Sequence, residues 1–205
     1  MFRAVLIPMT FVAALAGAEA GELPFLKPSV DYSGTRVMDT AQGRIQQQLY
    51  WTQDKVRTET DFQGMSVTNI VRQDLGLMWI VNAGMSQCLE QSLDQVDADM
   101  GLASGDALEA GDVDYEELGK ETINGIETTR YRVVSKDAGE VHRAMFWVTA
   151  ENIPLKMQVE PGGENGDQAV TMTLEDLRIG PVDSSLFESP GQCMPMPAMP
   201  ETGQP

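Results

Sequence analysis

Side chains that perform most enzyme chemistry are scarce in this sequence. His142 is the single histidine among 205 residues, which excludes a His–His metal pair and the H-E-x-x-H zinc motif. The sequence also contains no G-x-S-x-G nucleophile elbow and no glycine-rich phosphate loop. Aspartate and glutamate are abundant, but no carboxylate pair stands out as an acid–base couple. We therefore expect a non-catalytic protein without a cofactor, with His142 at the surface end of a strand.

The two cysteines, Cys88 and Cys193, are the next candidates for chemistry. In an exported protein, which meets an oxidising environment, an even number of cysteines indicates a disulfide bridge. Such a bridge would tie the C-terminal tail to a strand around Cys88, and bridges of this kind contribute about 2–4 kcal/mol. The alternative is a pair of free thiols, which ligate metal ions when they are deprotonated.

A methionine-rich tail follows the second cysteine. Thioether and thiolate sulfur are the ligands that Cu(I) prefers, and prolines between the methionines keep such a tail extended. A disulfide would remove the cysteine from any copper site, so copper binding is the lesser alternative. Its candidate ligands are Met194, Met196 and Met199.

The sequence is strongly acidic, with a formal net charge of −17 from 31 acidic and 14 basic residues. This balance argues against nucleic acid or an anionic membrane surface as a main partner. Between residues 73 and 119 there is no lysine or arginine. Asp97 and Asp99 suggest a calcium loop, but the EF-hand spacing is not met. We expect a solvated acidic insertion over about 92–112.

The first twenty residues have the composition of a signal peptide. Arg3 precedes an apolar core, and Ala18-Glu19-Ala20 is an A-x-A cleavage site. A membrane anchor is the alternative. Pro8 and the short apolar segment argue against it, because a spanning helix needs about 20 apolar residues. We expect cleavage after Ala20, a periplasmic location and no integral membrane segment.

Four short strand-like runs occupy residues 43–81. Ile45, Gln47, Leu49 and Trp51 share one face of the first run, which is the period-2 pattern of a half-buried strand. The links between the runs are so short that only hairpins can join them. This stretch therefore predicts an antiparallel meander.

The pattern changes after Cys88 and then returns to strands. Ser92 and Gln95 form a capping box before a predicted helix at 93–100, and a weaker helix is expected at 106–110. Further on, Asn124-Gly125 is a strong hairpin signal. Apolar residues change phase between Leu174 and Leu177, which predicts a β-bulge near 175–176.

These elements predict a mainly β protein with a small helical insertion. We expect about ten or eleven antiparallel strands in a single curved sheet or half-open β-barrel, with the insertion as a short helical lid. The β domain should cover residues 21–190 after the signal peptide at 1–20. A Met- and Pro-rich tail at 191–205 should remain irregular.

Five motifs occur in a characteristic order, at residues 50–57, 72–79, 119–125, 146–154 and 183–190. Together they resemble an exported bacterial family catalogued as a domain of unknown function. That family is similar in fold to the lipoprotein carriers LolA and LolB and to outer-membrane lipoprotein-sorting proteins. The resemblance covers roughly residues 30–200 and implies a half-open barrel with a helical lid over an apolar cavity. It does not imply lipoprotein-carrier activity, because the functional residues of that carrier find no match here.

At three places, two large apolar residues are adjacent in the sequence, so their side chains point to opposite faces of the strand. One interpretation is that one face packs a core while the other lines a pocket for an apolar ligand. The other is that a helix fills this face and all of them are core. The pairs are Tyr50 with Trp51, Met78 with Trp79, and Phe146 with Trp147. Among them we favour Trp79 as pocket wall, since a rigid ring can line a cavity at little entropic cost.

The function expected from these observations is binding or carriage of a lipid, lipoprotein or other apolar ligand in the periplasm. The alternative is a structural or protein-interaction module of the cell envelope, with an envelope protein as its partner and a filled inner face.

Overall fold

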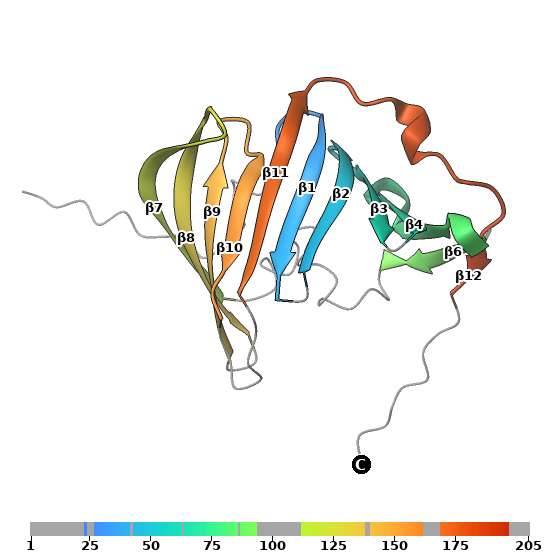
Figure 1. Ribbon diagram of the computed structural model, residues 1–205, viewed down its shortest axis with the longest axis horizontal. Coiled ribbons are helices and arrows are strands. Elements are labelled where there is room, and N and C mark those ends of the chain that lie inside the picture. The colour runs from blue at the N-terminus through green and yellow to red at the C-terminus, as the bar shows by residue number, and fades with distance from the viewer. Residues whose placement is uncertain are drawn as a thin grey trace, which may run out of the picture.

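The computed structural model describes residue 23 and residues 27–41, 43–62, 64–85, 87–93, 112–137, 140–161 and 169–196. The described residues form one twisted sheet and three single-turn 3-10 helices, η2 (Gln73–Leu75), η3 (Ala83–Met85) and η6 (Ser184–Phe187) (Figure 1). The strands are β1 (Tyr32–Thr40), β2 (Gly43–Thr52), β3 (Lys55–Phe62), β4 (Met65–Arg72), β5 (Leu77–Asn82), β6 (Gln87–Ser92), β7 (Asp112–Ile123), β8 (Ile126–Asp137), β9 (Glu140–Val148), β10 (Pro154–Val159), β11 (Val170–Ile179) and β12 (Met194–Pro195).

The strand order is β12-β6-β5-β4-β3-β2-β1-β11-β10-β9-β8-β7. Two meanders, β1–β6 and β7–β11, join through the pairing of β1 with β11, and the short β12 is parallel to β6. The predicted mainly β, antiparallel fold is therefore confirmed, as an open sheet with β7 and β12 at its edges. The strand count exceeds the prediction because part of the predicted tail joins the sheet as β12.

Some predictions concern residues outside the described ranges. The signal peptide at 1–20 and the helices at 93–100 and 106–110 fall there, except for Leu93, so these remain predictions. Ser92, the predicted N-cap, is the last residue of β6. Within the described part of the chain, no helix has both the length and the apolar character needed to cross a membrane.

The structure confirms two local predictions. The β7–β8 hairpin turns at Asn124 and Gly125, whose φ angles of 50° and 82° suit a tight hairpin turn. On β11, the register shifts against β1 around Asp176, which has φ 52°, so the predicted bulge is present. Opposite the bulge lies Gly34, where a Cβ atom would stand 2.9 Å from the carbonyl oxygen of Glu175.

Two faces of the sheet can be followed through the register, because directly paired residues point to the same side. We call the face that includes Tyr32, Trp51 and Val56 the inner face. It carries two cores, one on β7–β10 and one on β1, β2, β10 and β11. The first contains Leu23, Val113, Val133, Ala144, Phe146, Val148 and Met157, and the second contains Tyr32, Leu49, Ile153, Leu155 and Leu174.

The opposite, outer face differs between its two halves. On β7 and β8 it bears three ion pairs, Arg130–Glu121 at 3.5 Å, Arg132–Glu116 at 3.0 Å and Lys136–Asp114 at 3.6 Å. Their side chains are exposed, so each pair contributes little to stability. On β3–β5 the outer face instead carries a third core of Ile70, Trp79 and Phe187.

A C-terminal segment, residues 181–196, covers this third core, and we call it the C-terminal strap. It leaves the end of β11, forms η6 and ends at β12 beside β6 (Figure 1). Arg57 Nη1 donates to the carbonyl oxygen of Leu186 at 2.9 Å, and Arg72 Nη1 donates to that of Phe187 at 3.1 Å. The strap therefore closes the outer face of β3–β5 with its own side chains and backbone.

Candidate functional site

The inner face of β1–β6 carries apolar side chains that belong to none of the three described cores. They are half-buried, and the strand register places them all on the same face of the sheet. Val71, for example, pairs with Val56 and Met78, while Ile80 pairs with Leu89. We call this set the inner apolar surface. Its members are Met38, Ile45, Val67, Val71, Ile80 and Leu89.

Polar side chains interrupt this surface toward the middle of the sheet. Gln47 Nε2 donates to Thr60 Oγ1 at 2.9 Å, and Arg36 on β1 pairs in register with Gln47. The Arg36 side chain is half-buried, and burial lowers the pKa of its guanidinium. A cation thus lies beside a hydrophobic surface, where it can interact with an anion.

An aromatic pair borders the surface on β1 and β2. The rings of Tyr32 and Trp51 stack with centroids 5.5 Å apart and an interplanar angle of 21°. Tyr32 is buried, and this burial raises the pKa of its phenol to about 12, although the positive charge of Arg36 acts in the opposite direction. The phenol therefore stays neutral throughout the physiological pH range.

The raised pKa of Tyr32 predicts an alkaline loss of stability. A phenol whose pKa is higher in the folded state than in the unfolded state stabilises the fold below pH 10, and this contribution disappears as the pH rises from 10 to 12. The shift corresponds to about 2–3 kcal/mol. Tyrosinate absorbance should show one late-titrating phenol, and Tyr32→Phe should abolish it. Titration of all tyrosines near pH 10 would contradict the burial of this ring.

The six residues predicted to line a pocket lie on both faces of the sheet. Their strand register places Trp51, Met78 and Phe146 on the inner face, and Tyr50, Trp79 and Trp147 on the outer face. They therefore cannot form one pocket wall. Trp51 and Tyr50 are half-buried and the other four are buried.

The two outer tryptophans have structural partners. Trp79 Nε1 donates to Glu90 Oε2 at 2.9 Å, and its ring packs in the third core under the strap. Trp147 Nε1 donates to Glu121 Oε2 at 2.8 Å, and Lys156 Nζ lies 4.5 Å from its ring centroid. The strap is distant in sequence from Trp79, so period-2 patterning alone could not reveal that it covers this ring.

Sequence reasoning missed Arg36 and most of the inner apolar surface. The sequence contains a signal for Arg36, since this residue has the same parity in β1 as the apolar residues Tyr32 and Met38. A charged residue at an apolar parity position is unusual and indicates a specific role or partner. For Ile80 and Leu89, only the register shows that they lie opposite each other beside Asn69 and Thr58.

The sulfur atoms form the predicted bridge. Cys88 and Cys193 are joined in a disulfide, and neither of them is a free thiol. Met194 is 55% exposed and Met196 is half-exposed, whereas Met199 lies outside the described residues. With Cys193 in the disulfide, a copper site would depend on thioethers alone. His142, the other residue considered for chemistry, is half-buried near the start of β9.

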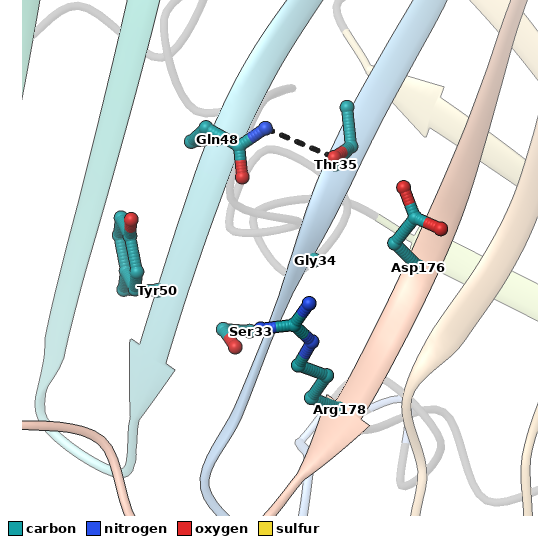
Figure 2. Close-up of a pocket in the computed structure, with 7 residues that line it drawn as sticks. All are labelled: Ser33, Gly34, Thr35, Gln48, Tyr50, Asp176 and Arg178. Carbon is teal, nitrogen blue, oxygen red and sulfur yellow. Dashed lines mark hydrogen bonds between the residues drawn. The ribbon is translucent and has the colours of Figure 1, made fainter.

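A polar depression of about 220 Å³ lies on the outer face near the bulge (Figure 2). Gln48 Nε2 donates to Thr35 Oγ1 at 3.0 Å within it, and the Arg178 side chain extends toward Ser33. The depression is open and its lining is hydrophilic. It is suited to ordered water or a small polar solute rather than to an apolar ligand. Its lining residues are Ser33, Gly34, Thr35, Gln48, Tyr50, Asp176 and Arg178.

Comparison with known proteins places the chain in a family. The profile of DUF4412, a domain of unknown function, matches residues 34–158. The chain belongs to the DUF4412 family. This membership confirms the predicted resemblance to a family of unknown function. None of the curated proteins matches the chain.

Solved structures share the fold at low sequence identity. An uncharacterized conserved protein of Thermus thermophilus has a TM-score of 0.55 and 11% identity, over 82% of this chain and 90% of that one. MucB has a TM-score of 0.55 and 14% identity, over 84% of this chain and 62% of MucB. The MucA/MucB complex of Pseudomonas aeruginosa gives a TM-score of 0.50 and 15% identity, over 80% and 57% of the chains. The DUF4412 chain therefore spans about three fifths of MucB and shares its fold.

Proposed function

We propose that this DUF4412 protein is an exported, non-catalytic binding or carrier protein whose inner face takes a lipid or another apolar ligand. The inner apolar surface is the observation that supports this proposal most directly. Its six side chains are half-buried and share one face of the sheet, yet they pack into none of the described cores. Apolar area that a folded domain leaves at its surface in this way is typical of a binding surface.

The other parts of the structure are consistent with this use of the inner face. The strap covers the outer face of β3–β5, and exposed ion pairs lie on that of β7 and β8. The inner face of β1–β6 thus carries half-buried apolar side chains that none of the described cores includes. A ligand that buried them would gain about 25 cal/mol for each square ångström of apolar area.

Export is part of this proposal and is supported by two observations. The Cys88–Cys193 bridge is typical of an oxidising compartment such as the periplasm, and residues 1–20 have the composition of a signal peptide. Mass determination of the mature protein tests it, with cleavage after Ala20 as the expected result.

Substitution on the inner apolar surface tests the site. Ile80→Gln is expected to weaken binding of a fluorescent fatty acid about tenfold, because a loss of about 1.4 kcal/mol of apolar contact is a factor of ten. Val81→Gln is the matched control, since Val81 is the next residue of β5 and points to the outer face. Equal effects of the two substitutions would contradict binding on the inner face.

Tryptophan emission gives a second readout of the same binding. Trp51 is half-buried on the inner face, whereas Trp79 and Trp147 are buried on the outer face. Ligand binding should therefore change the emission of wild type and of Trp79→Phe and Trp147→Phe, but not that of Trp51→Phe. A ligand response that depends on Trp79 instead would place the ligand beneath the strap.

A protein-interaction module of the envelope is the second candidate function. The likeness in fold to MucB, which has been solved in complex with MucA(peri), favours it. Native mass spectrometry of protein purified without detergent distinguishes the two functions. Co-purifying lipid supports the carrier, whereas an empty protein that binds an envelope protein supports the module.

A further inference from the structure

Arg36 differs from the other half-buried arginines of the described chain. Arg57 pairs with Glu59 at 2.7 Å, and Arg72 pairs with Asp74 at 2.6 Å. No hydrogen bond or ion pair between described residues involves the Arg36 side chain, and among the described residues Tyr32 is the titratable group that acts on its pKa. Arg36 is therefore a guanidinium set into the sheet without a carboxylate partner among the described residues.

The surroundings of Arg36 are apolar on one side and polar on the other. Its cross-strand neighbours are Leu174 on β11 and Gln47 on β2, and Met38 follows two positions later on the same face. Burial disfavours a charged group unless it is paired, and an arginine side chain keeps its charge because its pKa is so high. An anion bound from solution would remove this unfavourable desolvation.

We propose that Arg36 binds the anionic head of a single-chain amphiphile, a carboxylate or a phosphate, whose hydrocarbon chain lies on the inner apolar surface. This inference rests on the proposed function and specifies its ligand class. A guanidinium is suited to both head groups, because its planar donors match their oxygen atoms in pairs. The charge of the site also explains why a strongly acidic protein can accept an anion there.

The dimensions of the sheet agree with this arrangement. Arg36 lies on β1, Gln47 on β2 and Thr60 on β3 separate it from Val67 on β4, and apolar side chains follow at Ile80 on β5 and Leu89 on β6. Four strand spacings from β1 to β5 give about 19 Å along the sheet. An acyl chain in a bilayer spans about 15 Å, half of the hydrocarbon thickness. The surface is thus long enough for one chain that starts at Arg36.

Displacement of a fluorescent fatty acid by matched ligands tests the inference. The ligands are palmitate, palmitoyl lysophosphatidic acid and the uncharged monopalmitoylglycerol, with acetate and inorganic phosphate as anions without a chain. Arg36→Gln should weaken binding of the two charged amphiphiles about tenfold to a hundredfold and change that of monopalmitoylglycerol less than about twofold. Arg36→Lys should restore part of the loss, since it keeps the charge.

Arg178→Gln is the matched control, because Arg178 is an exposed arginine on the outer face. It should leave all affinities unchanged. Equal weakening of charged and uncharged ligands by Arg36→Gln, or no weakening at all, would overturn the inference and leave the proposed function standing. Acetate or phosphate binding as tightly as the amphiphiles would also overturn it, in favour of a free-anion site. If no amphiphile binds the wild-type protein, both the inference about Arg36 and the proposed function are overturned.

Discussion

Phe187→Ala is expected to lower the free energy of unfolding by about 3–5 kcal/mol, the range for loss of a buried aromatic side chain. Phe187 is 1% exposed, and it fills the third core between Ile70 and Trp79. Its removal leaves a cavity beneath the strap, and the collapse needed to fill it would displace the carbonyl group that Arg72 binds. Urea denaturation followed by far-ultraviolet circular dichroism measures the change.

Leu75→Ala serves as the control for this substitution. Leu75 is also a large apolar residue, but it is 53% exposed, so its truncation should change stability by less than about 0.5 kcal/mol. If Phe187→Ala were as mild as Leu75→Ala, the strap would not pack on the outer face as described. Trp79 emission gives a local check, because loss of Phe187 exposes that ring to water.

Removal of the disulfide should have the second large effect. The Cys88–Cys193 bridge closes a loop with a sequence separation of 105, and the double substitution to serine is expected to lower the free energy of unfolding by about 2–4 kcal/mol. The double variant avoids a single free thiol. Thermal unfolding with and without reductant measures the effect, since reduced wild type should match the variant and the variant should not respond to reductant.

Ligand binding separates the role of the disulfide from that of the inner face. Cys88 pairs with Val81, so it belongs to the outer face, and the strap that it holds does not contact the inner apolar surface through any described core. Below its melting temperature, the serine variant should therefore bind a fatty acid with unchanged affinity. If the melting temperature of the wild-type protein does not fall when reductant is added, the stabilising role of the bridge is contradicted.

Local patterns in the sequence were sufficient for much of the sheet. Alternation in β2 and β4, the Asn124-Gly125 turn and the phase change at Asp176 each arise within a few residues, because side-chain parity and turn conformation are local properties. The bridge was also predictable, since only two cysteines were present and export indicates an oxidising compartment.

Contacts between residues that are distant in the sequence could not be predicted from such local patterns. Tyr32 meets Ile179 across the β1–β11 pairing, and this contact joins the two meanders into one sheet. In strands with apolar side chains on both faces, such as β5, the sequence pattern does not show which face is exposed to solvent. Trp79 lies on such a strand, and in the structure it packs with Phe187 in the third core.

By itself, the sequence determined a mainly β, antiparallel, disulfide-bridged and strongly acidic protein, because period, turn chemistry, cysteine number and net charge need no knowledge of distant contacts. Only the tertiary structure decided which apolar residues are core and which form a surface. The strap covers one face of β3–β5 through contacts that Arg57, Arg72 and Phe187 make far along the chain. Long-range packing therefore left Arg36 and Ile80 on the inner face, where the proposed ligand site lies.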